Sequence, residues 1–443
     1  MTPTSLRDEI VRFPSILAVL ALALTVRGAL SAQLPGGYER ERGRIMLRVV
    51  REHLEEHYYD STFRGIDLRA AAARADSLIQ VAQSNSQIFT VIAQFVLALD
   101  DSHTQFYPPR RAADVEYGWE LQMIGDSCYV VWVEPGSDAA AKGLTVGDRV
   151  LALDRYLPTR RHFYLLRYFY RGLDPRAAMR FVIEAPDGSR RTLDVQARVT
   201  ERRRIADLTG DDLSEFIREF QNIERRWRDE STRVGDEVLI WRMGWFGDER
   251  EIDRGMDHAR SVGTLILDLR GNPGGLERGL VRLVGRVFDR RLVVDTIRRR
   301  RETRVVESTP VGRPFAGRLY VLIDSRSASA AEVFARLVQQ EGRGVVLGDR
   351  SAGLVMRSMN HALSMGVDIR IFYALSITDA DVIMPDGARL ERRGVQPDTL
   401  VLATAADLAA GRDPVLAVAL ALAGHPMDSA RAGTLLPRRE GYW

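Results

Sequence analysis

The chain has 443 residues, of which 45% are hydrophobic and 28% are charged, and its formal net charge is +3. This length predicts two or three globular domains, and the weak net charge argues against a dedicated nucleic-acid-binding protein, which would concentrate basic residues on one face. Cys128 is the only cysteine, which excludes an intramolecular disulfide and a cysteine zinc site. Lys142 is the only lysine.

Residues 1–32 have the features of an export signal. Two arginines precede the apolar run Ile16–Val26, which is too short to span a bilayer but fits the core of a signal peptide. Small residues follow, and cleavage is expected near Ser31 or Ala32. We therefore expect an exported protein, periplasmic or extracellular. An uncleaved signal that anchors the chain to a membrane is the alternative, because Arg27 lies in the cleavage region.

The next stretch, residues 33–112, is predicted to be a small helical domain. Apolar residues recur at helical spacing around 45–54, 68–81 and 88–99. In the first of these segments, His53-Leu-Glu-Glu-His57 matches the H-x-x-E-H pattern of inverted zinc peptidases. An exposed, charged helix face explains the same residues, and so short a pattern is a weak signal. We therefore expect no metal site and keep zinc as a minor alternative.

This helical stretch ends in a predicted loop, Asp101-Ser-His-Thr104. His103 has the unperturbed pKa of a general base that works near neutral pH. A polar surface side chain is the simpler interpretation of a single loop histidine, so the loop by itself decides nothing.

Residues 113–200 are predicted to form a β domain. The segment Tyr129–Asp154 has a strand, a Pro-Gly turn, a short alanine-rich helix and a second strand, and in this order it resembles a PDZ domain. PDZ domains bind extended peptides by adding a strand to a sheet edge. Tyr117-Gly-Trp-Glu-Leu121 stands where the carboxylate-binding loop would fall, but it departs from the usual glycine-rich form. A spacer or lid is therefore the alternative.

A charged, helical connector is predicted for residues 201–235, followed by an α/β core at residues 236–425. In the core, strands alternate with helices, which indicates an α/β fold. Residues 426–443 are predicted to be a poorly ordered tail. The predicted strands are Glu237–Phe246, Val262–Leu269, Leu319–Ile323 and Gly344–Gly348, and the predicted helices are Leu276–Phe288, Ala330–Gln340 and Asp413–Leu422.

Two segments of this core have backbone suited to bind a negative charge. Asn272-Pro-Gly-Gly275 follows a strand, and its glycines let backbone N–H groups approach a ligand, although an ordinary tight turn has the same pattern. Ser329 stands at the amino end of a predicted helix, where free N–H groups and the helix dipole favour an oxyanion. Ser329-Ala-Ala-Glu332 also fits a capping box, which is the commoner explanation of such a pattern.

Five motifs stand in a recognisable order and together resemble one protease family. They are similar to the carboxyl-terminal-processing (tail-specific) serine proteases and the related tricorn core protease, over nearly all of the mature chain. The resemblance implies an α/β multidomain fold with a helical N-terminal domain, a PDZ-like domain and a ClpP/crotonase-like catalytic core. The motifs are Asp101-Ser-His-Thr104, the PDZ-like segment, Leu267-Asp-Leu-Arg-Gly-Asn-Pro-Gly-Gly275, Ser327-Ala-Ser-Ala-Ala-Glu332 and Glu391-Arg-Arg-Gly-Val-Gln-Pro-Asp398.

The family has two kinds of active site, and this sequence fits one of them. For the tail-specific branch, the resemblance implies a Ser/Lys dyad whose lysine stands about 25 residues after the serine. At that position this chain has Leu354. The tricorn-like branch uses histidine as the base, which is the arrangement the resemblance implies here. A fallback base is His361. The implied roles are Ser329 as nucleophile, His103 as general base, Ser102 and Glu391 as groups that orient and stabilise the imidazole, and Ala330 with Gly274 or Gly275 as oxyanion donors.

We therefore expect an exported serine endopeptidase that cleaves peptides or unfolded protein through an acyl-enzyme, without a cofactor. Its expected partners are peptide or protein substrates and not nucleic acid, and a homo-oligomer is left open. The alternative is a family member that has lost catalysis and binds peptides through its PDZ-like domain as a scaffold.

Overall fold

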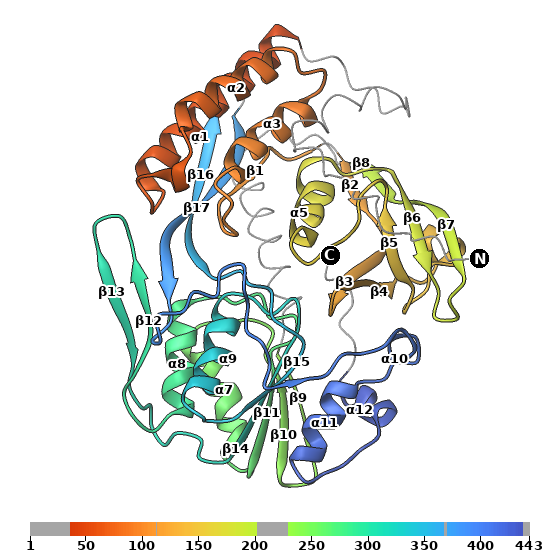
Figure 1. The fold of residues 1–443 in the computed structure, drawn as a ribbon, viewed down its shortest axis with the longest axis vertical. Helices are drawn as coiled ribbons and strands as arrows, with labels where there is room; N and C mark the ends of the chain where they lie inside the picture. Colours follow the sequence, from red (N-terminus) through yellow and green to blue (C-terminus); the bar gives the residue numbers. More distant parts are fainter. Residues whose placement is uncertain (1–35, 112, 202–228, 367–369, 437–443) are drawn as a thin grey trace, which may run out of the picture.

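The computed structural model describes residues 36–111, 113–201, 229–366 and 370–436. The predicted signal at residues 1–32 and most of the predicted connector lie outside these described residues. Figure 1 shows a helical unit and a five-stranded unit above an α/β core, with the strands β16 and β17 running from the core to the helices.

The helical unit, residues 36–111, contains the three predicted helices. They are α1 (Gly37–His57), α2 (Leu68–Gln80) and α3 (Asn85–Leu97), with the 3-10 turn η2 (Phe63–Gly65) between the first two. The side chains of Asp67 and Ser84 cap α2 and α3 by accepting backbone N–H bonds. The apolar faces of the helices pack on one another and on Phe106, Leu375 and Ile377, which belong to the strands β1 and β17 described below.

The five-stranded unit, residues 113–201, is an antiparallel sheet in the order β3-β4-β5-β6-β7, beside a two-stranded ribbon of β2 and β8. Trp119 and Phe181 meet edge to face in its core, with ring centroids 4.9 Å apart. The elements are β2 (Ala113–Glu116), β3 (Trp119–Ile124), β4 (Ser127–Val133), α4 (Asp138–Ala141), β5 (Arg149–Leu153), α5 (Phe163–Tyr168), the π-helical turn η3 (Phe169–Leu173), β6 (Ala178–Glu184), β7 (Arg190–Gln196) and β8 (Arg198–Glu201).

The α/β core has a six-stranded sheet in the order β18-β15-β14-β11-β10-β9, parallel except for β9. Helices α7, α8 and α9 cover one face, and α11 and α12 cover the other (Figure 1). The elements are β9 (Glu230–Val234), β10 (Val238–Arg242), α7 (Glu249–Ala259), β11 (Thr264–Asp268), α8 (Glu277–Val287), β14 (Arg318–Ile323), α9 (Ala330–Gln340), β15 (Val345–Gly348), β18 (Thr399–Leu400), α10 (Ala405–Ala409), α11 (Pro414–Leu422) and α12 (Ser429–Leu435).

A second sheet joins the core to the helical unit. Its long strand β17 (Ile371–Ile383) pairs along one side with β16 (Met356–Met365) and along the other with β1 (Gln105–Tyr107) and β12 (Leu292–Arg298). Strand β13 (Thr303–Ser308) then pairs with β12. Because β1 directly follows the loop that carries His103, this sheet fixes the position of that loop relative to the core.

Three elements differ from the sequence-based predictions. Residues 230–234 form strand β9, where the predicted helical connector extends to residue 235, because they pair with β10 at the sheet edge. Residues 429–435 form helix α12 in the predicted tail, because Ala432 and Leu436 pack into the apolar cluster under α11. The predicted strand Glu237–Phe246 ends at Arg242, and Phe246 instead forms an isolated bridge to Gly275.

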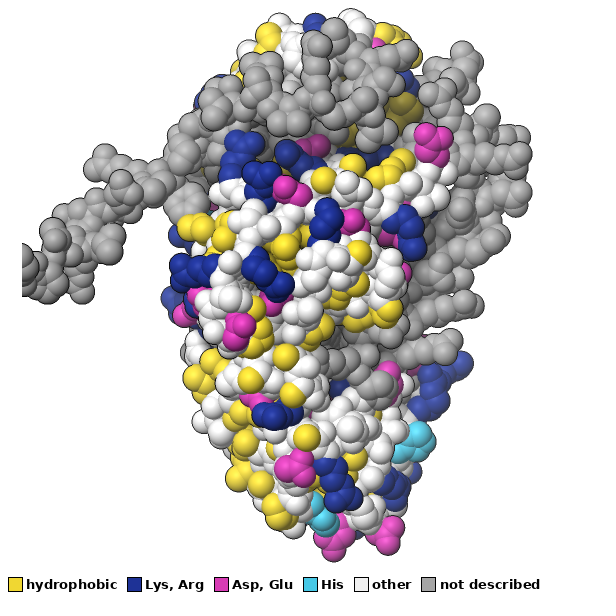
Figure 2. Space-filling view, turned by 90° about the vertical axis from the view of Figure 1, so that its right-hand side faces the viewer, with side chains coloured by type: hydrophobic (Ala, Val, Ile, Leu, Met, Phe, Trp, Pro, Cys, Tyr) yellow, Lys and Arg dark blue, Asp and Glu magenta, His cyan; other side chains and the backbone are white. Residues whose placement is uncertain are grey.

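On the face shown in Figure 2, basic and acidic side chains are interspersed, as the small net charge leads one to expect. Within the described residues, none of the helices combines the length and the apolar character that crossing a lipid bilayer requires. The chain is a mixed α/β protein of several units, with a helical region at its described amino end.

Candidate active site

Ser329 lies between strand β14 and helix α9, at the amino end of the helix. Its backbone has φ 56° and ψ −119°, in a region that residues with a side chain rarely adopt. Such conformations persist only where the surrounding contacts impose them, and they are concentrated at functional sites. The turn therefore presents Ser329 in a strained geometry that an ordinary helix cap, with its extended backbone, does not need.

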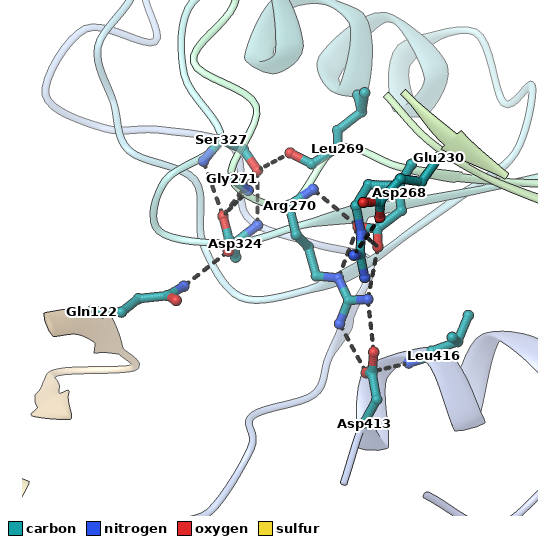
Figure 3. A network of polar contacts seen from close by, with 11 residues as sticks. Gln122, Glu230, Asp268, Leu269, Arg270, Gly271, Asp324, Ser327, Asp413 and Leu416 are labelled. Atoms are coloured by element: carbon teal, nitrogen blue, oxygen red, sulfur yellow. Dashed lines mark hydrogen bonds and ion pairs between the residues drawn. The ribbon is translucent and has the colours of Figure 1, made fainter. Parts of the chain in front are cut away.

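The loop before Ser329 is held by Asp324 (Figure 3). The Asp324 carboxylate accepts the N–H groups of Gly271 at 2.9 Å and Ser327 at 3.1 Å. The buried Ser327 hydroxyl donates to the carbonyl oxygen of Leu269 at 2.8 Å. These bonds connect the loop after β14 to the loop after β11, so that the two strand ends hold the turn together.

A buried ion network lies beside this loop (Figure 3). Arg270 binds Asp268 and Asp413, each at 2.8 Å, and thereby ties the carboxyl end of β11 to the start of α11. Burial acts to raise the pKa of Asp268, but Arg270 and Arg242 outweigh it and hold that pKa well below its usual range. A cavity of about 230 Å³ is lined by this network and by β3, and neither Ser329, His103 nor Glu391 lines it.

The glycine turn at residues 274 and 275 lies against Ser329. A Cβ atom built on Gly274 would be 2.6 Å from the Cβ of Ser329 and 3.0 Å from the nitrogen of Ala330, so only glycine fits. The N–H of Gly274 donates to Asn272 Oδ1 at 2.9 Å, which removes it from the expected oxyanion donors. Among the described residues, no acceptor is recorded for the N–H groups of Gly275 and Ala330.

Glu332 is fully buried in the first turn of α9 and binds both Ser329 and the loop opposite. Its carboxylate accepts the N–H groups of Ser329 at 3.1 Å, Gly353 at 2.7 Å and Leu354 at 2.9 Å, and the hydroxyl of Ser351 at 2.5 Å. Burial raises the pKa of Glu332 to about 7, although these donors act against the rise. The bond expected from the capping box is present, and the same carboxylate also fixes residues 351–354.

His103 lies in a loop that Asp101 organises. The Asp101 carboxylate accepts the N–H groups of His103 at 2.9 Å and Thr104 at 2.7 Å, and the hydroxyl of Thr378 in β17 at 2.7 Å. Burial lowers the pKa of the His103 imidazole to about 4; Asp101 acts to raise it and Arg392 to lower it. The ring is therefore neutral at pH 7 and can accept a proton.

A chain of three side chains leads from His103 to a carboxylate. The Ser102 hydroxyl lies 2.6 Å from Nδ1 of His103 and donates to Glu391 Oε2 at 2.9 Å. The backbone N–H of Ser102 donates to Glu391 Oε1 at 3.0 Å. Burial raises the pKa of Glu391, while the Val355 N–H, the Ser102 hydroxyl and Arg392 act to lower it. The sequence places Ser102 and Glu391 289 residues apart, and the fold brings them into contact.

The peptide group between Leu354 and Val355 joins this chain to Ser329. Its carbonyl oxygen accepts the N–H of Ser329 at 3.0 Å, and its N–H donates to Glu391 Oε2 at 2.9 Å. Within the described residues no hydrogen bond joins the Ser329 hydroxyl to the His103 ring. Catalytic hydrogen bonds are often long in ligand-free enzymes and shorten in the substrate complex. The expected residues thus meet in one region, except that Gly274 has its N–H engaged.

The fallback base His361, the histidines of the alternative zinc site and the only lysine lie away from this region. The ring of His361 packs on His57 and His53, with centroids 4.5 Å and 5.5 Å away, so that the fallback base contacts α1 instead of the serine. No group of residues suited to a metal ion occurs in the described part of the chain. Lys142 donates to the carbonyl oxygen of Asp194 in the five-stranded unit.

Three features of the site were missed by the sequence analysis. Asp101 holds the histidine loop, Asn272 Oδ1 orients the glycine turn, and Glu332 binds four donors where a helix cap was expected. The spacing Ser-x-x-Glu pointed to the last of these, because a carboxylate three residues into a helix can reach the N-cap. Nothing in the sequence pointed to its contacts with residues 351–354.

The chain is similar in sequence or in fold to several known proteins. A model described as peptidase family S41 matches residues 239–401. The carboxyl-terminal-processing protease of Picosynechococcus sp. is 24% identical over 374 residues, which cover 81% of this chain and 82% of that protein. A protease of the same name from Synechocystis sp. is 23% identical over 72% of both chains. The crystal structure of mature CPAF superposes with a TM-score of 0.64 at 17% identity, over 84% of this chain and 95% of that one.

The matched residues 239–401 contain the glycine turn, Ser329 and Glu391. The similarity to the processing proteases extends beyond them over most of the chain. Residues 239–401 therefore match peptidase family S41, and the chain is a serine peptidase that is similar over most of its length to carboxyl-terminal-processing proteases.

Proposed function

We propose that this protein is a serine endopeptidase in which Ser329 is the nucleophile and His103 the general base. The observation that carries the proposal is the peptide group Leu354–Val355, which binds Ser329 on one side and Glu391 on the other. Glu391 reaches the imidazole through Ser102. A serine hydroxyl needs a nearby base, and that base needs a third group that fixes its tautomer and stabilises its cation.

In the proposed reaction, His103 takes the proton of the Ser329 hydroxyl as the oxygen attacks the carbonyl carbon of a peptide bond. The carbonyl oxygen becomes an oxyanion that binds the N–H groups of Gly275 and Ala330. His103 then returns the proton to the leaving amine, the C–N bond breaks, and an acyl-enzyme remains on Ser329. A water molecule, deprotonated by His103, hydrolyses this ester and releases the second product.

The residues support a tricorn-like site and not a Ser/Lys dyad. Leu354 occupies the position where the resemblance leads one to expect lysine, and its backbone, not its side chain, contacts Ser329. The only lysine, Lys142, donates to a backbone carbonyl in the five-stranded unit. The half-buried, neutral His103 supplies the base in its place.

We also propose that the five-stranded unit is PDZ-like and gates the site. A peptide would add to the outer edge of β3, where two carbonyl groups accept bonds from the loop before Ser329. Arg326 donates to the carbonyl of Leu121 at 2.8 Å, and Ser325 donates to that of Met123. A peptide that takes this edge would have to release the loop, so recruitment would act directly on the nucleophile turn.

The predicted signal at residues 1–32 supports export, and we propose a periplasmic or extracellular location. A reporter test suits this proposal, since residues 1–32 fused to alkaline phosphatase should yield active enzyme outside the cytoplasm. Inactive fusions, with normal expression, would contradict it.

A fluorophosphonate probe tests the catalytic proposal directly. The wild type should be labelled and should degrade reduced, carboxymethylated casein, and Ser329→Ala should do neither. Ser77→Ala is the control, because it changes an exposed serine of helix α2 that has no part in the proposed triad or in the loop before Ser329. If Ser329→Ala is labelled as fast as the wild type, the assignment is wrong. If the wild type binds peptides without labelling or cleavage, the protein is the inactive scaffold.

A further inference from the structure

Strand β16 begins at the active site, and among the described residues no strand pairs with its outer edge. Val355, whose N–H binds Glu391, is the residue before the strand, and Arg357 pairs with Glu277, two residues after Gly275. The start of β16 and the glycine turn therefore flank Ser329. From there β16 runs with β17 toward the helical unit (Figure 1).

The backbone groups on the outer edge of β16 have no strand partner among the described residues. All ten of its residues, Met356–Met365, are paired with β17, and no other strand in the described part of the chain pairs with it. No further backbone hydrogen bond is recorded for these residues among those described. Within the described part of the chain, the N–H and C=O groups that point away from β17 therefore have no backbone partner and can pair with an added strand.

This edge also lacks the residue types that usually prevent another strand from pairing with it. Proteins protect edge strands with charged side chains, especially lysine, and with proline. The segment from Ser358 to Met365 contains no Lys, Arg, Asp, Glu or Pro. Strand β13, at the opposite edge of the same sheet, carries Arg304 and Glu307 in only six residues. The outer edge of β16 therefore lacks the charged side chains that the other edge strand, β13, carries.

Exposed side chains beside the open edge are apolar or small. Met359 is 58% exposed, and Phe372, which stands across from Ser364, is 47% exposed. Asn360, Ala362 and Ser364 are exposed as well. Such a surface tolerates many sequences, because it offers backbone bonds and few specific contacts.

We propose that the outer edge of β16 binds an extended stretch of the polypeptide substrate as an added strand, next to the scissile bond. At about 3.3 Å per residue, the ten residues of β16 can pair with a stretch of similar length. This subsite selects unfolded chains over folded ones, because a folded segment has no free backbone to pair. The inference rests on the proposed function and adds to it the physical basis for choosing unfolded chains.

A variant with lysine along the edge tests the subsite. In Asn360→Lys/Ala362→Lys/Ser364→Lys, kcat/KM for carboxymethylated casein should fall about fivefold or more relative to the rate of fluorophosphonate labelling. Val305→Lys, an exposed position on the opposite edge strand, should leave this ratio as in the wild type. An unchanged ratio in the triple variant would overturn the subsite. Absence of labelling in the wild type would instead overturn the proposed function, and the subsite with it.

A second measurement uses the unaltered enzyme, so it does not depend on the variant's folding. A casein-derived dodecapeptide that the wild type cleaves is N-methylated at one amide at a time. Strand addition predicts that KM rises at every second residue, because alternate N–H groups face the partner strand. Binding through side chains alone predicts no alternation, and that result would refute the proposal.

Discussion

Ser329 and Glu391 bind the two ends of one peptide group. The Leu354 carbonyl accepts the Ser329 N–H at 3.0 Å, and the Val355 N–H donates to Glu391 at 2.9 Å. A peptide group is planar and rigid, so it sets the separation between the nucleophile's backbone and the carboxylate. In the proposed mechanism, the carboxylate that stabilises the imidazolium is therefore held at a fixed separation from the backbone of Ser329.

The link from Glu391 to His103 through Ser102 predicts unequal effects of two substitutions. Glu391→Gln should lower kcat by roughly 10²–10⁴-fold with little change in KM, because the imidazolium loses its charge partner and the amide NH₂ can no longer accept one of the two backbone N–H bonds to residue 391. Ser102→Ala should lower kcat less, since the carboxylate stays close and a water can replace the hydroxyl. Steady-state kinetics on casein peptides measure both. Equal losses, or a change confined to KM, would contradict the relay.

The lowered pKa of His103 predicts how activity depends on pH. The base must be neutral, so kcat/KM should rise with pH around pH 4, where the folded ring loses its proton, and a separate change toward pH 7 belongs to Glu332, whose pKa is about 7. Labelling rates in this range, with circular dichroism at each pH to confirm folding, provide the measurement. A transition near 6.5 that persists in Glu332→Gln, where residue 332 cannot titrate, would show that the imidazole keeps the pKa of an unperturbed histidine.

The same shift makes folding pH-dependent. Between about pH 6.5 and pH 4 the unfolded chain binds a proton at His103 that the folded chain does not, so stability should fall as the pH drops through this window. The His103→Gln variant should lose less stability than the wild type between pH 7 and pH 5. Urea denaturation at both values measures the difference. Parallel curves for the two proteins would contradict the assignment.

Gly274 predicts a steric effect on the nucleophile. In Gly274→Ala the new methyl group would lie 2.6 Å from the Cβ of Ser329, and the turn must move, so kcat should fall by at least about tenfold. Gly188→Ala is the matched control, because Gly188 also has a positive φ, of 85°, but open space around its Cβ. Both variants share the backbone strain. Similar kinetics in the two would show that the contact with Ser329 has no role.

Glu332 predicts a coupled loss of stability and reactivity. In Glu332→Gln the amide NH₂ would face backbone N–H donors, so at least one buried bond is lost, and stability should fall by about 1–3 kcal/mol at pH 7. Because the same carboxylate binds Ser329 and residues 351–354, labelling of Ser329 should slow as well. Urea denaturation and labelling kinetics test this pair of effects. Destabilisation with an unchanged labelling rate would make Glu332 a structural residue only.

The elements of the fold were predictable where local pattern and local structure agree. The three N-terminal helices, the buried strand at 319–323 and the helix at 330–340 followed from apolar spacing. Strand β9 was taken for part of a helical connector, since Glu230–Val234 is charged and becomes a strand only by pairing with β10. Helix α12 was missed because its apolar residues are few and are buried by α11.

The residue types of the site could be recognised in the sequence, but the contacts between them could not. A serine at a helix start, a loop histidine and a glycine pair are local features that the sequence shows directly. The count of one lysine, at position 142, was enough to argue against a Ser/Lys dyad. The contacts of Ser102 with Glu391 and of Ser329 with Leu354 join segments distant along the chain, and only the packing of the two sheets decides such contacts. The engaged N–H of Gly274, the buried carboxylate of Glu332 and the open edge of β16 likewise exist only once the chain has folded, because burial and hydrogen-bond partners belong to the tertiary structure.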